Sequence, residues 1–111
     1  ENDFELAMIE AIQSKGYRCI PNIGVAGFFI DIAVVDPSDT NSFILGIECD
    51  GASYHSVTSI RDRERLRKLV LTNLGWTIHR VWSLDWYRNQ QEELAKIIEL
   101  IKSIERIRRV S

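Results

Sequence analysis

The 111-residue sequence predicts an α/β domain, a central mixed β-sheet of about four strands with helices on both faces. Two observations lead to this fold class. Apolar residues recur at helical spacing near both ends of the chain and once in its middle. Between these stretches lie short apolar segments rich in β-branched and aromatic residues, which gives the order α-β-β-β-α-β-α. We expect a single domain over residues 1–111, excised from a longer protein.

The N-terminal segment predicts a helix followed by an edge strand. Asn2 or Asp3 can cap the helix, and Gly16 ends it. Residues 17–21 alternate like a short strand at the edge of a sheet. The apolar stripe of the helix consists of Phe4, Met8, Ile9 and Ile12.

Two longer strands follow and form a hairpin. Gly24 and Gly27 frame a turn before residues 28–35, whose continuous apolar character is typical of a buried strand. The turn-forming residues 36–41 connect this strand to another over residues 42–49, so we expect the two strands to pair.

The C-terminal half predicts helices on either side of one more strand. A helix starting near Ser59 has the spacing of a capping box and ends at Gly75. Residues 76–82 alternate as a fourth strand, and Ser83 or Asp85 opens a short helical turn. Residues 91–110 form a long amphipathic helix. The inward faces consist of Leu66, Leu69, Val70 and Leu74 in the first helix, and of Leu94, Ile97, Ile98, Ile101 and Ile104 in the last.

Charge is distributed unevenly although the net charge is only −2. Residues 1–57 hold nine acids and two bases, whereas residues 58–111 hold seven acids and twelve bases. This asymmetry fits a metal site beside a phosphate-binding face, and it equally fits ordinary solvated helices.

The cysteines and the hydropathy pattern bear on location. Cys19 and Cys49 lie in apolar strands without metal-ligand spacing, which favours free thiols in a reducing, cytoplasmic setting over a disulfide. No apolar run is long enough for a membrane span, so we expect no membrane partner.

Three carboxylates occur at the predicted hairpin. Asp31 interrupts an apolar strand, and Glu48 and Asp50 stand two residues apart, hence on one face of the next strand. The hairpin brings Asp31 close to Glu48, although the sequence leaves the register open. Carboxylates gathered at one sheet edge suit Mg²⁺ or Mn²⁺. The alternative is a separate salt bridge for each acid, such as Asp31 with Arg80.

Two further groups are candidates for the same site. His55 follows the acidic pair on the adjoining turn, where it could act as general base or acid, although a lone loop histidine is more often a surface residue. Glu5 joins the site if the first helix crosses the sheet edge. An acid in the first turn of a helix is also favoured by the helix dipole alone.

The helix that starts near Ser59 carries candidate nucleic-acid-binding residues. Its basic side chains could grip phosphates near the proposed metal centre, or form a salt-bridged solvent face with the acids between them. The candidates are Arg61, Arg63, Arg65 and Lys68.

Four segments follow the pattern of a known family. They are FFIDIAV (28–34), LGIECDGASYHS (45–56), RDRERLR (61–67) and LGWTIHRVWSLDW (74–86). Over residues 4–87 the chain resembles the PD-(D/E)XK restriction-endonuclease-like superfamily, and within it the branch of the very-short-patch (Vsr) mismatch-repair endonucleases. It looks most similar to nuclease domains at the C-terminus of large superfamily I helicase-like proteins.

The resemblance implies a restriction-endonuclease-like three-layer sandwich and DNA cleavage with Mg²⁺ or Mn²⁺. It also implies work with a helicase in the same or another chain, with a homodimer as a further option. In this resemblance Asp31 matches the metal-ligating aspartate and Glu48 the glutamate of the (D/E)XK strand. His55 matches the second histidine of the Vsr branch, and Glu5 its first-helix glutamate.

Asp50 departs from the family pattern, because most of the superfamily has lysine there and the Vsr branch has histidine. Either Asp50 is an additional metal ligand, or His55 or a basic side chain of the following helix takes the lysine's role. A domain that binds DNA without cleaving it is the alternative function.

Overall fold

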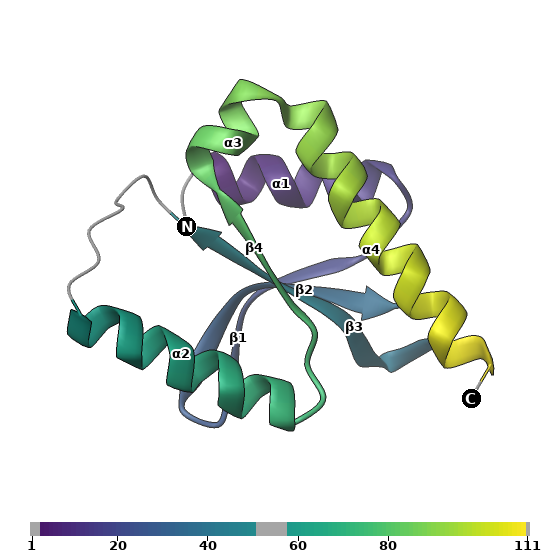
Figure 1. Cartoon of the computed structure of the whole chain (residues 1–111). Helices are drawn as coiled ribbons and strands as arrows, with labels where there is room; N and C mark the ends of the chain where they lie inside the picture. Colours follow the sequence, from purple (N-terminus) through teal and green to yellow (C-terminus); the bar gives the residue numbers. More distant parts are fainter. Residues whose placement is uncertain (1–2, 51–57, 111) are drawn as a thin grey trace.

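The computed structural model describes the backbone of residues 3–50 and 58–110, and the side chains of these residues except Asp50 and residues 58–64. It confirms the α/β fold. The elements in chain order are α1 (Asp3–Ser14), β1 (Cys19–Val25), β2 (Phe28–Asp36), β3 (Asp39–Asp50), α2 (Thr58–Asn73), β4 (Ile78–Trp82), α3 (Ser83–Arg88) and α4 (Gln90–Val110) (Figure 1).

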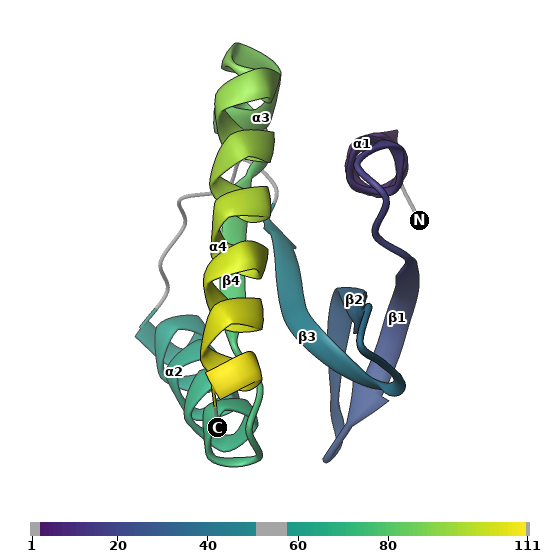
Figure 2. The ribbon, with the colours of Figure 1, turned by 90° about the vertical axis from the view of Figure 1, so that its right-hand side faces the viewer.

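The strands form one mixed sheet in the order β1-β2-β3-β4. The pairs β1–β2 and β2–β3 are antiparallel, and β3–β4 is parallel because α2 connects them as a crossover. β3 therefore runs between the β1–β2 hairpin and β4 (Figure 2). α1, α3 and α4 gather on one side of the molecule, and α2 lies on the other (Figure 1). This arrangement is a sandwich consistent with a restriction-endonuclease-like fold.

The main hydrophobic core lies between the sheet and the two helices α1 and α4. The helices contribute residues at three- and four-residue spacing, and the strands contribute every second residue, as the two periods require. The fully buried members include Met8 and Ile12 of α1, Ile32 and Val34 of β2, Leu45 and Ile47 of β3, and Ile97 and Ile101 of α4. The apolar stripes predicted for the first and last helices are confirmed.

The inward face predicted for α2 is wrong. Leu66, Leu69 and Leu74 are 55%, 56% and 58% exposed, whereas Arg67 and Leu71 are buried. Positions 67 and 71 lie one turn apart and face the sheet together. The strand beneath them presents the carboxylate of Glu48, so a cation packs there instead of a leucine.

Both hairpin turns are shorter than predicted. β1 continues through Gly24 to Val25, and the turn consists of Ala26 and Gly27, whose φ angles of 52° and 83° are both left-handed. Two left-handed central residues are typical of the tight turns that match strand twist. The second turn is Pro37–Ser38, with β3 starting at Asp39.

Cys19 and Cys49 are free thiols, as predicted. Cys19 is buried, and burial raises its pKa to about 12. Among the helices of residues 3–50 and 58–110, none is both long and apolar enough to cross a membrane.

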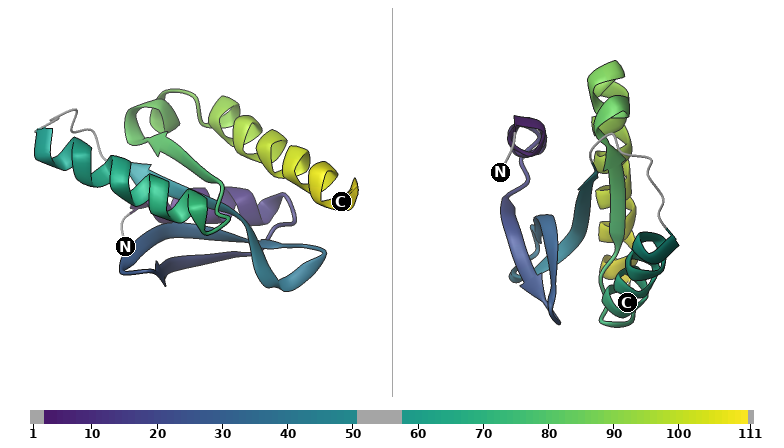
Figure 3. Two further views of the ribbon diagram at one scale, coloured as in Figure 1. Left: turned by 60° about the horizontal axis from the view of Figure 1, so that its bottom comes forward. Right: turned by 90° about the vertical axis from the view of Figure 1, so that its left-hand side faces the viewer.

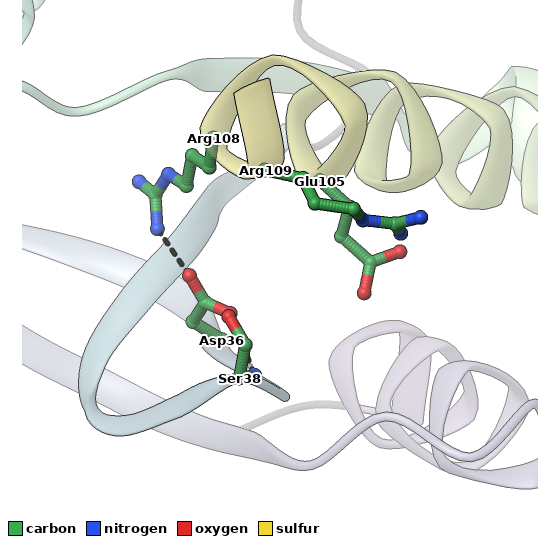
Figure 4. Close-up of a pocket in the computed structure, with 5 residues that line it drawn as sticks. All are labelled: Asp36, Ser38, Glu105, Arg108 and Arg109. Carbon is green, nitrogen blue, oxygen red and sulfur yellow. Dashed lines mark hydrogen bonds and ion pairs between the residues drawn. The ribbon is translucent and has the colours of Figure 1, made fainter. Parts of the chain in front are cut away.

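The C-terminal end of α4 is fastened to the β2–β3 turn (Figure 4). Arg108 donates a hydrogen bond of 2.6 Å to the carboxylate of the buried Asp36 and one of 3.1 Å to the carbonyl of Phe43. The other oxygen of Asp36 accepts hydrogen bonds from the backbone N–H and the hydroxyl of Ser38. Burial by itself raises the pKa of Asp36, but the bonds from Ser38 and Arg108 outweigh it, so the pKa is lowered.

Replacing Arg108 by glutamine is expected to lower the free energy of unfolding by about 1–2 kcal/mol at pH 7, because a charge-assisted bond to a buried acid is lost and Arg108 stays partly exposed. A lowered folded pKa stabilises the protein above the unfolded value near 4, and the effect is lost as the pH falls through the folded pKa. The variant should therefore lose less stability than the parent on acidification. Urea unfolding at several pH values measures both effects. Arg109→Gln, on the next residue, is the matched control, and an equal loss there would contradict the assignment.

Candidate active site

Asp31 lies where β2 departs from regular pairing with both neighbouring strands. On the β1 side the pairing skips Asn22, whose φ of 58° is left-handed. On the β3 side the paired residues end at Ile32 and Ile47. Instead of a ladder bond, the Asp31 carboxylate accepts a hydrogen bond of 2.8 Å from the backbone N–H of Cys49. The open end of the β2–β3 hairpin, away from its turn, thus holds the Asp31 carboxylate in a fixed orientation.

Glu5 and Cys49 meet Asp31 at this point. One carboxylate oxygen each of Glu5 and Asp31 and the Sγ atom of Cys49 all lie within 4.8 Å of one another, and all three residues are partly buried. Glu5 belongs to α1, Asp31 to β2 and Cys49 to β3. The group therefore exists only because α1 packs across the open end of the β2–β3 hairpin. The structure thus brings the Glu5 carboxylate close to that of Asp31.

The electrostatics of this group favour a hard cation. Burial raises the pKa of the Cys49 thiol, and the negative charges of Asp31, Glu5 and Glu48 raise it further. The thiol is therefore protonated at neutral pH and is a poor ligand, whereas the two carboxylates repel each other. Carboxylate oxygens at this spacing suit Mg²⁺ or Mn²⁺. Small side-chain movements would bring the oxygens of Glu5 and Asp31 within bonding distance of one such ion.

Glu48 lies on the opposite face of β3 from Cys49, because neighbouring strand residues alternate. Its side chain is buried, and its carboxylate forms an ion pair with Arg67 of α2. The same Arg67 guanidinium donates a hydrogen bond to the carbonyl of Phe29 in β2. Among the described residues, Glu48 is not part of the group formed by Glu5, Asp31 and Cys49. Arg67 instead connects α2 to the two strands that carry the acids.

The remaining predicted site residues are placed only in part. Asp50 ends β3 opposite Trp82 of β4, but its side chain lies outside the description, as does the whole of His55. Arg61 and Arg63 belong to α2, and their side chains are not described either. Arg65 and Lys68 are exposed and line one groove together with Arg67, Ile78 and Arg80.

Sequence reasoning missed two members of the site. Cys49 was assigned only to the core, although its position one residue from Glu48 places it on the face that α1 covers. Arg67 is not among the candidate residues that the sequence predicts for α2. Its spacing of four residues from Leu71 was a signal for an inward position, but three leucines at helical spacing gave a stronger and misleading one.

A comparison with family models finds one match that spans most of the chain. Residues 4–101 match the model of the restriction-endonuclease-like family REase_MTES_1575. A search of curated proteins found none whose sequence matches the chain. The family match covers α1, the whole sheet and part of α4, and so includes every described residue of the candidate site.

Proposed function

Because the chain belongs to this restriction-endonuclease-like family, and is thus a nuclease-like domain, we propose that it is a DNA endonuclease that requires Mg²⁺ or Mn²⁺. The observation that carries the proposal is the approach of Glu5 and Asp31 at the end of the β2–β3 hairpin. Two partly buried carboxylates within 4.8 Å of each other repel, and a divalent cation between them removes the repulsion.

The residues have separate roles in this proposal. Asp31 and Glu5 hold the divalent ion, and the backbone N–H of Cys49 keeps the Asp31 carboxylate oriented. When bound, the ion would neutralise the phosphodiester charge and lower the pKa of an attacking water. Glu48, on the opposite face of β3, holds Arg67 in place beside the reaction centre. Asp50 adds a further carboxylate from the end of β3, and His55 moves a proton to or from the reacting groups.

The basic side chain beside Glu48 bears on the unusual Asp50. A lysine at position 50 would supply a positive charge near the (D/E)XK glutamate. Arg67 supplies one from α2 through its ion pair with Glu48. This pairing supports the option that a side chain of α2 takes the lysine's role, with Asp50 as a further acid.

The wider context of the activity rests on the sequence resemblance. We propose that the domain is a nuclease module of a longer, cytoplasmic protein, working with a helicase in DNA repair, processing or defence. Pairing of two copies on one DNA substrate is an additional option that the resemblance leaves open.

The test is DNA cleavage by the parent chain and by Glu5→Gln, which removes one carboxylate of the metal-binding pair. Supercoiled, single-stranded, flapped and mismatched DNA are each incubated with Mg²⁺ or Mn²⁺, and with a chelator instead of metal. We expect cleavage that requires metal and falls by roughly 10²-fold or more in the variant, since a carboxylate of the reaction centre is lost. Glu99→Gln is the matched control, because Glu99 is an exposed acid of α4. Equal cleavage by the parent and Glu5→Gln would contradict the site assignment.

The second candidate function is DNA binding without cleavage. It is favoured by one observation, the engagement of the Glu48 carboxylate by Arg67, together with the acid at position 50. This alternative predicts that DNA binding persists in the presence of a chelator and that no substrate is cut with either metal.

A further inference from the structure

A basic groove lies between α2 and β4, on the face of the sheet opposite the main core. Its lining consists of Arg65, Arg67 and Lys68 of α2 and Ile78 and Arg80 of β4, around a volume of about 300 Å³. α2 leads through a short loop into β4, and the two elements lie next to each other near this connection (Figure 3). Four of these five residues are cationic, and within the described part of the chain no acid lines it.

The groove is adjacent to the candidate active site through two contacts. Arg80 is the direct neighbour of Glu48 in the parallel β3–β4 pairing, so the two side chains share one face of the sheet. Arg67 both lines the groove and forms the ion pair with Glu48. Any anion in the groove is therefore held beside the strand that carries the (D/E)XK glutamate.

The cations differ in how firmly they are held. Arg67 is buried, while Arg65, Lys68 and Arg80 are exposed. The Arg80 guanidinium lies over the Trp82 ring, 5.7 Å from its centre, a cation–π contact that limits its movement. A guanidinium held in place loses less conformational entropy when it binds a ligand.

The size and charge of the groove select among ligands. The volume of about 300 Å³ is more than a single small ion needs. Guanidinium and ammonium groups are the usual donors to phosphate oxygens. The groove therefore suits a phosphate group together with part of the sugar–phosphate backbone that carries it.

We propose that this groove binds a backbone phosphate of the nucleic-acid strand, with Arg80 of β4 as a contact in addition to Arg65 and Lys68. The proposal rests on the proposed function for the identity of the ligand, and it adds a specific site on the face opposite Glu5 and Asp31. The bound phosphate lies next to Glu48 without touching the metal-binding pair.

The test is the salt dependence of DNA binding without cleavage. Fluorescence anisotropy with a labelled duplex in a chelator gives the binding constant of the full 111-residue chain between roughly 50 and 200 mM salt. Arg80→Gln and Lys68→Gln should each weaken binding and reduce the slope of log K against log salt by about 1. The controls Arg106→Gln and Lys102→Gln remove the same charges from α4 and should leave the slope unchanged.

The outcomes separate this proposal from the proposed function. Reduced slopes in the groove variants support phosphate binding in the groove even if the parent chain cuts no DNA. In that case only the proposed nuclease function is contradicted. Parent-like slopes in the groove variants overturn the groove even if cleavage is robust. Equal reductions in the α4 controls would show a diffuse basic surface and would also overturn it. Circular dichroism of each variant confirms that the fold is retained.

Discussion

Asp31→Asn is expected to reduce metal-dependent DNA cleavage by roughly 10³-fold, the equivalent of about 4 kcal/mol in the barrier. The reason is the loss of one of the two charges that hold the cation. Asparagine keeps the oxygen that accepts the hydrogen bond from Cys49, so the strand geometry should persist. Initial rates with Mg²⁺ and Mn²⁺ measure the effect.

The same variant has an expected signature that does not depend on cleavage. Without metal it should be at least as stable as the parent, because the repulsion between Glu5 and Asp31 is removed. With metal, the parent should gain thermal stability and the variant should not, because a ligand stabilises only the state that binds it. Asp39→Asn is the matched control, since Asp39 also accepts a backbone N–H bond but is an exposed residue at the start of β3. Metal-induced stabilisation of the variant equal to that of the parent would place the ion elsewhere.

Arg67→Met is expected to lower the free energy of unfolding by about 3–5 kcal/mol. The substitution leaves the buried carboxylate of Glu48 without the guanidinium that compensates its desolvation, and it removes a donor to the carbonyl of Phe29. The free energy of unfolding of a small domain is only about 5–15 kcal/mol in total, so much of the stability would be lost. Urea unfolding at neutral pH gives the measurement.

Two further variants distinguish the ion pair from simple packing. Arg65→Met removes the same charge from an exposed position on the same helix and should change stability by no more than about 0.5 kcal/mol. The double variant Glu48→Leu, Arg67→Met replaces both charges by apolar groups and should recover most of the loss. If Arg67→Met alone were as stable as the parent, Arg67 would not carry the charge of Glu48.

The fold could be predicted where one physical signal dominated. In α1 and α4 the apolar residues recur at helical spacing against a polar background, and both faces were predicted correctly. The turn before β2 was predicted between Gly24 and Gly27 and is shorter than that. Alanine rarely adopts a left-handed φ, so Ala26 gave no signal for the observed turn at Ala26–Gly27. The face of α2 was missed because hydrophobicity alone ranks leucine above arginine as a buried residue, whereas here the sheet buries a charge.

The candidate site could be predicted as residue types but only partly as geometry. The resemblance to a family pointed to Glu5 and Asp31, and their approach in space agrees with it. The partner of Glu48 could not be found this way, because an ion pair between β3 and α2 depends on how the crossover helix is rotated. That rotation is set by packing over the whole sheet, and the three leucines of α2 indicated a different inward face.

The hydrogen bond that orients Asp31 has a consequence for sequence variation. It comes from the main chain of position 49, so it does not depend on which side chain stands there. Any residue except proline, which lacks an N–H group, can provide it. A related chain with serine, alanine or valine in place of Cys49 can therefore present the same aspartate in the same orientation. What such chains must share is a β3 strand that passes the aspartate of β2 along the same path.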